Sequence, residues 1–588
     1  MRATRPAKGR WARYMVALTV CVLAAGGSAA HAQSARGKGP ETSAQAHAAH
    51  ADRLVSALLA QGRDEEVTRV IVTVAPGGKQ RGLLRTLEAR GATVTADFTI
   101  TDTFAAEVPV KLLRWLQKHA DVVAISSDVE VHSMGISSDV SGTALESDYT
   151  LRSTLGLEST SLTGAGVTVA VVDSGLVLPG TNDQRVLTTR DFTTGLSNPK
   201  NVTAVDPNGH GTHVAGLIGD DSDEFKGIAP GVRYVSLRVL DRNGSGTTSS
   251  VIKALQWAIA NRKAHGIDVI NLSLGHPIYE PAATDPLVQA VEAAVRAGIV
   301  VVASAGNFGT NAETDEVGYA GISSPGNAPS AITVGALKTF DTTRRTDDLI
   351  ADYSSRGPTL IDGAAKPDLV APGHRLVAAA MTSQTLYTAH PELRVTLAKR
   401  RYLKLSGTSM SAAVVTGSVA LMLEEAKSEY GAVPTPNTIK AMLQATALPM
   451  QDETEKPYHV LAQGAGSVNP AGAITLAAAI NPTLPVGSYW LTHGVTESTT
   501  IDGQNIVWGD NIVWGDNIVW GDAVYTNNIV WGDNIVWGDN IVWGDNIVWG
   551  DNIVWGDNIV WGDNIVWGDN IVWGDNIVWG DSILTGGE

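Results

Sequence analysis

The stretch VTVAVVDSG at residues 167–175 decides the fold. Val167–Val172 is an unbroken apolar run rich in β-branched side chains, which is typical of a parallel strand buried on both faces. Asp173 follows directly, so we expect it at the carboxyl end of that strand, where ligands and reactive groups gather in open α/β sheets. The stretch therefore predicts an α/β fold with a mostly parallel central sheet and a functional site at this strand end.

Two further motifs supply a histidine and a serine among small residues. HGTHVAG begins at His210, and its small and apolar residues over 212–218 predict a helix packed closely on the sheet. GTSMS contains Ser409, and the apolar run over 411–426 predicts a buried helix, so Ser409 is expected near a helix N-terminus, where free N–H groups favour developing negative charge. A serine made nucleophilic by a histidine, which a carboxylate holds in one tautomer, is an arrangement that hydrolyses amides.

The order of the three residues narrows the class of enzyme. Chymotrypsin-like enzymes have the order His, Asp, Ser, and α/β-hydrolases have Ser, acid, His around a G-x-S-x-G elbow. The order Asp173, His210, Ser409 and the motifs around it resemble those of the subtilisin-like serine peptidases (subtilases, peptidase S8). The resemblance covers residues 145–480 and implies a subtilisin-like three-layer fold. It also implies that Asp173 orients His210 and that Ser409 forms an acyl-enzyme, which makes the chain a serine endopeptidase acting on protein or peptide substrates.

A fourth motif matches the same family. SAGNFG follows the apolar run 299–303 and contains Asn307. Subtilisin-like enzymes complete an oxyanion hole with an asparagine side chain, so the resemblance implies that Asn307 donates to the oxyanion beside the backbone N–H of Ser409. Loss of such a donor typically costs about 2.7–4 kcal/mol of transition-state stabilisation.

Two segments resemble the strands with which the family binds an extended substrate. LRVLDRNGSG at 237–246 contains Ser245 and Gly246, and NLSLG at 271–275 contains Ser273, Leu274 and Gly275. Binding on both sides would extend a sheet, with main-chain hydrogen bonds giving affinity and pockets giving preference. SSPG at 323–326 stands where the family often has a glycine beside the first specificity pocket, so the extra side chain is expected to narrow that pocket.

Each of these residues has a simpler alternative when it is taken alone. Asp173 is compatible with a turn or cap, Ser409 with a helix N-cap, and Asn307 with a turn between glycines. His210 and His213 are potential zinc ligands, but their spacing does not match H-E-x-x-H and no third ligand stands nearby. The joint occurrence in family order favours the peptidase, and none of the four catalytic positions is substituted.

Two segments depart from the family pattern. Thr382–Lys404 is longer than expected and basic, which predicts a surface loop near the site. The loop 219–227 carries four carboxylates in a region where some relatives bind calcium. Clustered carboxylates suit a structural calcium ion, but a solvated acidic loop is the favoured interpretation, and the metal stays open. No cofactor is expected for catalysis.

The N-terminus predicts export. Five basic residues precede the apolar run 14–25, and Ala30-His31-Ala32 follows, so residues 1–32 are predicted to be a signal peptide cut after Ala32. Cys21, the only cysteine, lies inside this segment, so disulfides cannot stabilise the remaining chain. We therefore expect a secreted or cell-surface protein.

Residues 53–132 predict a separate small domain. Strands at 67–74, 93–98, 105–110, 122–125 and 129–132 and helices at 80–90 and 111–118 follow a β-α-β-β-α-β pattern typical of a ferredoxin-like α+β domain. Its position before the peptidase resembles that of the inhibitory propeptide of the family (inhibitor I9-like); an unrelated binding domain is the alternative. The resemblance implies a self-processing zymogen whose own propeptide inhibits it from within the cleft, with a cut between about His132 and Asp148.

The C-terminal part is a repeat. Residues 481–504 have the Pro and Gly of a linker, and the hexapeptide NIVWGD then occurs 12 times between residues 505 and 581, interrupted once at 523–527. Ile-Val-Trp favours a strand and Gly-Asp-Asn a turn, which predicts a β-prone tail, stacked as a β-solenoid, that could self-associate. The net charge of −17, concentrated in these repeats, disfavours nucleic acid and anionic membranes as partners. The alternative function is a surface or assembly protein in which the repeats act and the peptidase only matures the chain.

Overall fold

The computed structural model describes residues 49–507 except for 77–79, 135–149, 179–183, 195–203, 312–313, 315, 398–399, 486–494 and 496–497. Beyond Val507 it describes the backbone of short strands between Asn534 and Leu584. The signal peptide prediction lies outside the described residues. Within the part described, no helix has the length and apolar character needed to cross a membrane.

The N-terminal part of the described chain is a small sheet with helices. Its elements are β1 (His50–Ala51), α1 (Arg53–Gln61), β2 (Val67–Val74), α2 (Gln80–Ala89), β3 (Thr93–Phe98), β4 (Thr103–Pro109), α3 (Val110–Gln117) and β5 (Val122–Ser127). The sheet order is β1-β5-β2-β4-β3, and Leu87 of α2 and Leu116 of α3 are buried against it. From β2 to β5 the elements run β-α-β-β-α-β, with the first strand beside the third and fourth.

The next strand, β6 (Glu130–Ser133), does not belong to this sheet. It pairs antiparallel with β10 (Ser245–Thr247) on one side and β12 (Leu274–Gly275) on the other, both from the large domain. The prediction that residues 129–132 complete the small domain is therefore wrong. β5 already supplies the last strand of the β-α-β-β-α-β pattern, and it is paired on both sides, with β1 and β2.

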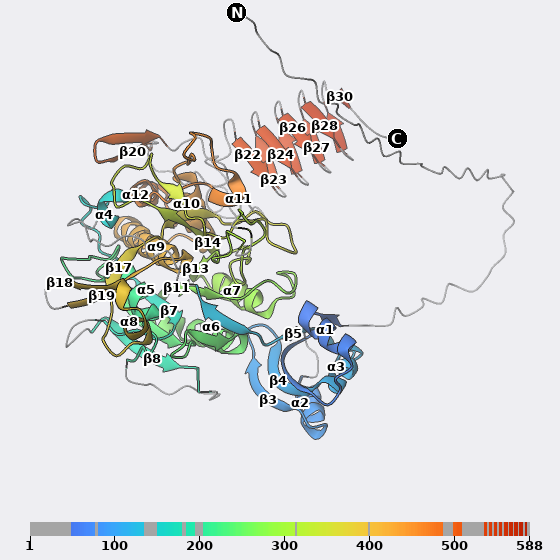
Figure 1. Ribbon diagram of the computed structural model, residues 1–588. Coiled ribbons are helices and arrows are strands. Elements are labelled where there is room, and N and C mark those ends of the chain that lie inside the picture. Colours follow the sequence, from blue (N-terminus) through green and yellow to red (C-terminus); the bar gives the residue numbers. More distant parts are fainter. Residues whose placement is uncertain are drawn as a thin grey trace, which may run out of the picture. The chain divides into compact units, whose positions relative to one another are not determined.

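The large domain is built on an eight-stranded sheet (Figure 1). The path is β15-β14-β13-β11-β7-β9-β8, and β16 also pairs with β14. All neighbours are parallel except β14 and β15. The strands are β7 (Thr168–Asp173), β8 (Val186–Asp191), β9 (Arg233–Arg238), β11 (Ile267–Leu272), β13 (Val300–Ser304), β14 (Ile332–Lys338), β15 (Leu349–Ile350) and β16 (Leu369–Pro372).

Helices cover both faces of this sheet and make three layers. Val169 and Val171 of β7 belong to a core with α5 (His210–Gly219), α9 (Thr408–Tyr430), α10 (Pro436–Ala445) and α12 (Pro470–Ala479). Ala170 and Val172 belong to a second core with α6 (Thr248–His265) and α7 (Pro286–Arg296). Alternate side chains of one strand thus enter opposite cores, as the apolar run predicted. Two short helices, α4 (Leu151–Thr154) and α11 (Val460–Gln463), complete the domain.

The segment predicted as a surface loop, Thr382–Lys404, is a built part of the domain. It contains α8 (Thr385–Ala389), the 3₁₀ turn η1 (Pro391–Leu393), β18 (Arg394–Leu397) and β19 (Arg400–Leu405). β19 pairs antiparallel with both β18 and β17 (Leu376–Ala379). The loop prediction is wrong because apolar side chains here, including Leu386 and Leu403, join the core beside α5.

Part of the range 481–504 packs on the large domain. β20 (Ser498–Ile501) forms an antiparallel hairpin with β21 (Gln504–Val507), which includes the start of the first repeat. Ile501 is buried and lies near Gly156, and Thr499 Oγ1 accepts a hydrogen bond from Asn469 Nδ2 at 2.9 Å. The structured domain therefore continues to Val507.

The described repeats form two parallel sheets. Each repeat from 534 to 579 supplies one strand, β22 (Asn534–Trp537), β23 (Asn540–Trp543), β24 (Asn546–Trp549), β25 (Asn552–Trp555), β26 (Asn558–Trp561), β27 (Asn564–Trp567), β28 (Asn570–Trp573) and β29 (Asn576–Trp579), and β30 (Ile583–Leu584) follows. Odd and even strands separate into the rows visible in Figure 1, so each strand from β22 to β27 pairs with the one two repeats later, and β28 pairs with β30. The register places identical residues opposite one another, Asn534 with Asn546 and Trp537 with Trp549. The repeats before Asn534 lie outside the described residues, apart from β21.

Candidate active site

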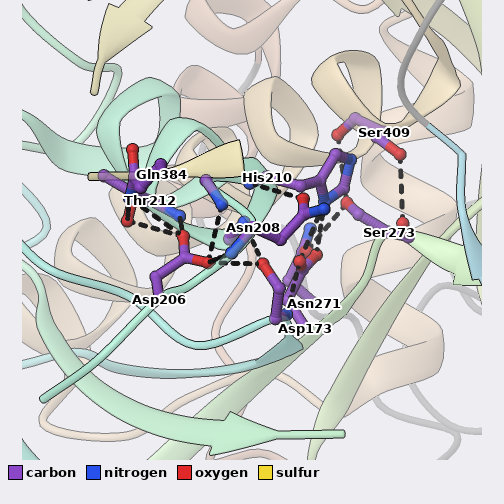
Figure 2. A network of polar contacts seen from close by, with 12 residues as sticks. Asp173, Asp206, Asn208, His210, Thr212, Asn271, Ser273, Gln384 and Ser409 are labelled. Atoms are coloured by element: carbon purple, nitrogen blue, oxygen red, sulfur yellow. Dashed lines mark hydrogen bonds and ion pairs between the residues drawn. The ribbon is translucent and has the colours of Figure 1, made fainter. Parts of the chain in front are cut away.

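Asp173 and His210 come together at the carboxyl end of the central strand. Asp173 is the last residue of β7 and His210 is the first residue of α5. His210 Nδ1 lies 2.8 Å from Asp173 Oδ1 and 2.9 Å from Oδ2, and both side chains are fully buried (Figure 2). A carboxylate can only accept, so this contact assigns the proton to Nδ1 and leaves Nε2 as a base. His210 Nε2 has no hydrogen-bond partner among the described residues.

Ser409 is the second residue of α9, where backbone N–H groups lack helical acceptors. Its hydroxyl donates to the carbonyl of Ser273 at 3.1 Å, and the Ser273 hydroxyl donates to the Ser409 carbonyl at 3.1 Å. In this arrangement the Ser409 hydroxyl is therefore bonded to the substrate-binding segment and not to His210. A rotation about one side-chain bond redirects such a hydroxyl without any movement of the backbone.

The two predicted oxyanion donors meet at one carbonyl oxygen. Ser409 N donates to the Met134 carbonyl at 3.3 Å, and Asn307 Nδ2 donates to the same oxygen at 2.8 Å. Thr408 fixes the orientation of the amide, because its N–H and its hydroxyl donate to Asn307 Oδ1 at 3.0 and 3.1 Å. These bonds leave Nδ2 free to point at Met134, so the pair can bind a carbonyl or an oxyanion.

The predicted substrate segments both hold the strand that ends at Met134. Ser245 pairs with His132 and Gly246 with Val131 in β10, and Leu274 pairs with Ser133 and Gly275 with His132 in β12. The Ser273 carbonyl accepts from Met134 N at 3.2 Å. All five residues predicted for substrate binding therefore lie along 131–134, which is held as an extended peptide between two strands, the mode called β-augmentation.

Comparison with known proteins identifies the family. Residues 164–468 match the profile of the Subtilase family, and they make up half of the chain. The chain belongs to this family. Serine protease AprX of Bacillus subtilis is 35% identical over 323 residues, which cover 53% of this chain and 67% of that protein. The extracellular serine proteinase of Thermus sp. is 34% identical over 380 residues, 64% of this chain and 78% of that protein.

A solved structure agrees at the level of the fold. Fervidolysin from Fervidobacterium pennivorans, described as a keratinolytic enzyme related to subtilisin, aligns with a TM-score of 0.55 at 19% identity. The alignment covers 78% of this chain and 66% of that one. The family and its serine protease members show that this subtilase is a subtilisin-like serine endopeptidase.

The side chain of Met134 in this subtilase is buried, with 7% of its surface exposed. A Cβ added to Gly275 would lie 3.2 Å from Met134 Cε and 2.9 Å from Ser323 Oγ, so glycine at 275 is what leaves room for the methionine. Ser323 Oγ donates to the Ala305 carbonyl at 3.3 Å and borders the same space. Met134 and Thr408 were not singled out from the sequence; the window predicted for the cut, between about His132 and Asp148, contains Met134.

The second histidine of the motif has a structural place. His213 Nε2 contacts the carbonyls of Leu376 at 3.1 Å and Leu403 at 3.0 Å, which tie α5 to β17 and β19. Burial, and the neighbouring charge of His210, lower the pKa of His213 to about 3, so it is neutral in the folded protein. His213 Nε2 is thus bonded to backbone carbonyls and is not placed to bind a zinc ion together with His210.

The acidic loop gives no metal cluster in the part of the chain that the structure describes. Asp220 Oδ1 accepts from Ser222 N at 2.8 Å, and burial raises the pKa of Asp220. No group of three or more His, Cys, Asp or Glu side chains among the described residues could hold a metal ion.

Proposed function

We propose that this endopeptidase is made as a zymogen that cuts its own chain between Met134 and Gly135. The observation that carries the proposal is the Met134 carbonyl, which lies between Ser409 N at 3.3 Å and Asn307 Nδ2 at 2.8 Å. A carbonyl held by both oxyanion donors, in a strand paired on both sides, has the placement of a bond about to be cut. The bond that follows this carbonyl joins Met134 to Gly135.

The first step makes the acyl-enzyme. Ser409 Oγ attacks the Met134 carbonyl carbon and its proton passes to His210 Nε2, while Asp173 stabilises the imidazolium that forms. The carbonyl oxygen becomes an oxyanion and strengthens its bonds to Ser409 N and Asn307 Nδ2. The carbon–nitrogen bond to Gly135 then breaks, and His210 gives the proton to the departing amine.

The second step releases the acyl group. Water attacks the ester between Met134 and Ser409 after His210 takes its proton, and the serine leaves with the proton returned to it. Nucleophile, base and oxyanion donors all come from the chain, so we expect turnover of peptides to survive chelation of metal ions. A chelator that abolished turnover of folded enzyme would contradict this expectation.

Residues 50–134 are proposed to inhibit the mature enzyme by staying in the cleft after the cut. β6 pairs with both substrate-binding strands, and the Met134 side chain is buried beside Gly275. Away from the cleft, the Asp128 carboxylate accepts from Ser249 N at 2.8 Å and Ser249 Oγ at 2.9 Å at the start of α6. An acidic group there is favoured by the helix dipole, so this contact adds affinity outside the cleft.

Terminal sequencing of purified protein tests the zymogen. Wild-type chain should acquire a new N-terminus at Gly135, whereas Ser409→Ala should remain uncut. Met134→Asp should slow the cut, because a carboxylate would be buried there without a partner, while Glu130→Gln at an exposed position of the same strand serves as its control. A cut at another bond, or the same N-terminus in the Ser409→Ala protein, would refute self-cleavage here.

Export is proposed from the sequence of residues 1–32, with its basic start, apolar run and small residues before the predicted cut. A similar Thermus protein is named an extracellular serine proteinase, which supports the same location. Detection of the enzyme outside the cell, with residues 1–32 removed, is the expected result.

The alternative function assigns the main role to the tail at the cell surface. The in-register pairing of identical strands favours an assembly that could extend from one chain to another. Cleavage of unrelated proteins by the mature enzyme supports the endopeptidase as the main function; cleavage of its own precursor alone supports the assembly protein.

A further inference from the structure

A second buried carboxylate lies beside the catalytic pair. Asp206 is 6% exposed and precedes His210 by four residues. Its Oδ1 accepts from Ser174 Oγ at 2.8 Å, Gly209 N at 2.8 Å and Asn208 N at 3.2 Å (Figure 2). Its Oδ2 accepts from Thr212 Oγ1 at 2.7 Å and Thr212 N at 2.8 Å, with Gln384 Nε2 further away at 3.4 Å.

These partners come from the segments that carry the two catalytic residues. Ser174 directly follows Asp173, and Ser174 N donates to Asp173 Oδ1 at 2.7 Å. The Ser174 hydroxyl also accepts a hydrogen bond at 3.0 Å from the N–H of Gly211, the residue that follows His210. Gly209 and Thr212 lie on either side of His210 in the first turn of α5. Asp206 therefore joins the end of β7 to the start of α5 through one carboxylate.

The segment 382–404, which was predicted to be a surface loop, supports the path of the chain from Asp206 to His210. Gln384 Nε2 donates to Thr212 Oγ1 at 2.9 Å, and the backbone N–H groups of Thr385 and Leu386 donate to the carbonyls of Pro207 at 3.0 Å and Asn208 at 2.9 Å. The path from Asp206 to His210 is thus fixed from two sides.

The chemistry of these contacts requires an acceptor at 206. Gly209 N, Asn208 N and Thr212 N are backbone donors that cannot reverse their role. Burial raises the pKa of the Asp206 carboxyl, and the hydrogen bonds from Thr212, Gly209 and Ser174 oppose that rise. An asparagine has the same shape, but its NH₂ group would replace one of the two carboxylate oxygens. That group would face the donors to Oδ1 or those to Oδ2, so asparagine could accept hydrogen bonds from only one of these two sets.

We propose that Asp206 is a positioning residue of the triad: it sets the distance and orientation between the strand end that holds Asp173 and the helix start that holds His210. The proposal rests on the proposed roles of Asp173 and His210. It does not place Asp206 in contact with substrate, so Asp206 acts through these two residues.

Substitution of Asp206 should lower the rate of the chemical step more than the binding of substrate. For Asp206→Asn we expect kcat on a small peptide to fall about 10- to 100-fold, the size typical of lost support or slight misplacement of catalytic groups, with KM within about twofold. The acid limb of kcat/KM should move to lower pH, because a loosened Asp173 contact stabilises the imidazolium less. Active sites titrated with a serine-directed phosphonate count only folded enzyme.

Two comparison variants separate positioning from other effects. Ser174→Ala breaks the link between Asp206 and the strand end without changing a charge, so it should move the acid limb in the same direction. Asp220→Asn removes a buried carboxylate at the C-terminal end of the same helix and should leave kcat and the acid limb unchanged. Both variants remain informative if Asp206→Asn does not fold.

Three results would overturn the proposal. In the first, Asp206→Asn lowers the melting temperature but titrated enzyme keeps the wild-type kcat and pH profile, which is a structural role alone. In the second, Ser174→Ala keeps the wild-type profile, so any effect at 206 is one of charge. In the third, Asp220→Asn lowers kcat as much as Asp206→Asn does, so removal of any buried carboxylate next to α5 has the same effect. Wild-type activity in Asp173→Asn would instead refute the proposed function itself.

Discussion

The catalytic domain and the repeat tail use parallel strands in opposite ways. In the catalytic domain, neighbours in the sheet come from distant parts of the chain, such as β7 beside β9 and β11, and no two strands share a sequence. In the tail, one hexapeptide supplies every described strand from β22 to β29, and each strand from β22 to β27 pairs with an identical strand two repeats later.

The difference shows what sequence variety contributes to a site. The non-repeating sequence of the catalytic domain permits one register, because a slip would move buried residues such as Val169 and Val171 to the other core. That single register brings Asp173, His210 and Ser409 to one place. In the tail, a shift by whole repeats reproduces the same contacts, so strands of one chain and of another are equivalent partners.

The largest expected effect abolishes catalysis and leaves the repeat tail unchanged. Ser409→Ala removes only the attacking oxygen, and loss of a triad serine typically lowers kcat on the order of 10⁶-fold. The variant should keep the wild-type circular dichroism spectrum, resist a serine-directed phosphonate, and retain any association of the tail. Turnover near that of wild type would remove Ser409 from the mechanism.

The next effect tests the oxyanion donor. Asn307→Ala deletes the Nδ2 that donates to the Met134 carbonyl, so kcat should fall about 10²- to 10³-fold with little change in KM. Thr408→Ser keeps the hydroxyl donor to Asn307 Oδ1 and serves as the conservative control. Equal losses in kcat for both variants would show that the loop, and not the amide, was disturbed.

Asp173, His210 and Asn307 are the candidate catalytic residues that depend most on local sequence. Asp173 follows an uninterrupted buried strand, and His210 and Asn307 stand in short motifs whose local geometry is set by glycine and small residues. The fold follows for the same reason, because buried strands and amphipathic helices are local patterns.

Residues whose role depends on distant partners were harder to predict. The proposed cut after Met134 depends on the pairing of β6 with β10 and β12, so the sequence defines only a window for it. Asp206 stands in Asp-Pro-Asn-Gly, which predicts a turn, and its partners Ser174 and Gln384 are far apart in the chain. The strands of the segment 382–404 were missed because they are short, and because β19 is held in the domain by β17, which lies more than twenty residues earlier.

A pH effect of intermediate size is expected where the small domain meets the catalytic domain. Glu280 is 5% exposed, its Oε2 accepts no hydrogen bond among the described residues, and His50 Nε2 lies 3.9 Å away. Burial, followed by the charge of Asp285, raises the pKa of Glu280 from 4.5 to about 8, and the charge of Asp52 adds to this rise. The folded chain therefore holds a proton that the unfolded chain has released at neutral pH.

The sign of the pH effect follows from this difference in bound protons. Between pH 4.5 and 8 the folded state binds more protons than the unfolded state, so Glu280 lowers the free energy of unfolding as pH rises through that window. In the uncut Ser409→Ala protein, Glu280→Gln should flatten this dependence and be the more stable form above pH 8. Denaturant unfolding across the window measures it, and parallel curves for the two proteins would contradict it.

The smallest effect on catalysis is expected from removal of the tail. A chain ending after Val507 keeps the β20–β21 hairpin and should match the full chain in kcat/KM on small peptides. A chain ending at Pro485 loses the buried Ile501 and the bond between Asn469 and Thr499, so its free energy of unfolding should fall by about 1.5–3 kcal/mol or more. Equal stability of the two chains would show that the hairpin is not part of the domain.

The same pair of proteins tests how charge acts in the tail. Each repeat adds one Asp and no basic residue, so stacked repeats repel one another while their strand edges attract. Salt screens this repulsion, since the Debye length is about 8 Å at 0.15 M. Association of the full chain, measured by sedimentation, should therefore strengthen with added salt and be absent in the chain ending after Val507. Association that weakened with salt, or persisted without the repeats, would place the contact in the catalytic domain, because attraction between opposite charges is what salt diminishes.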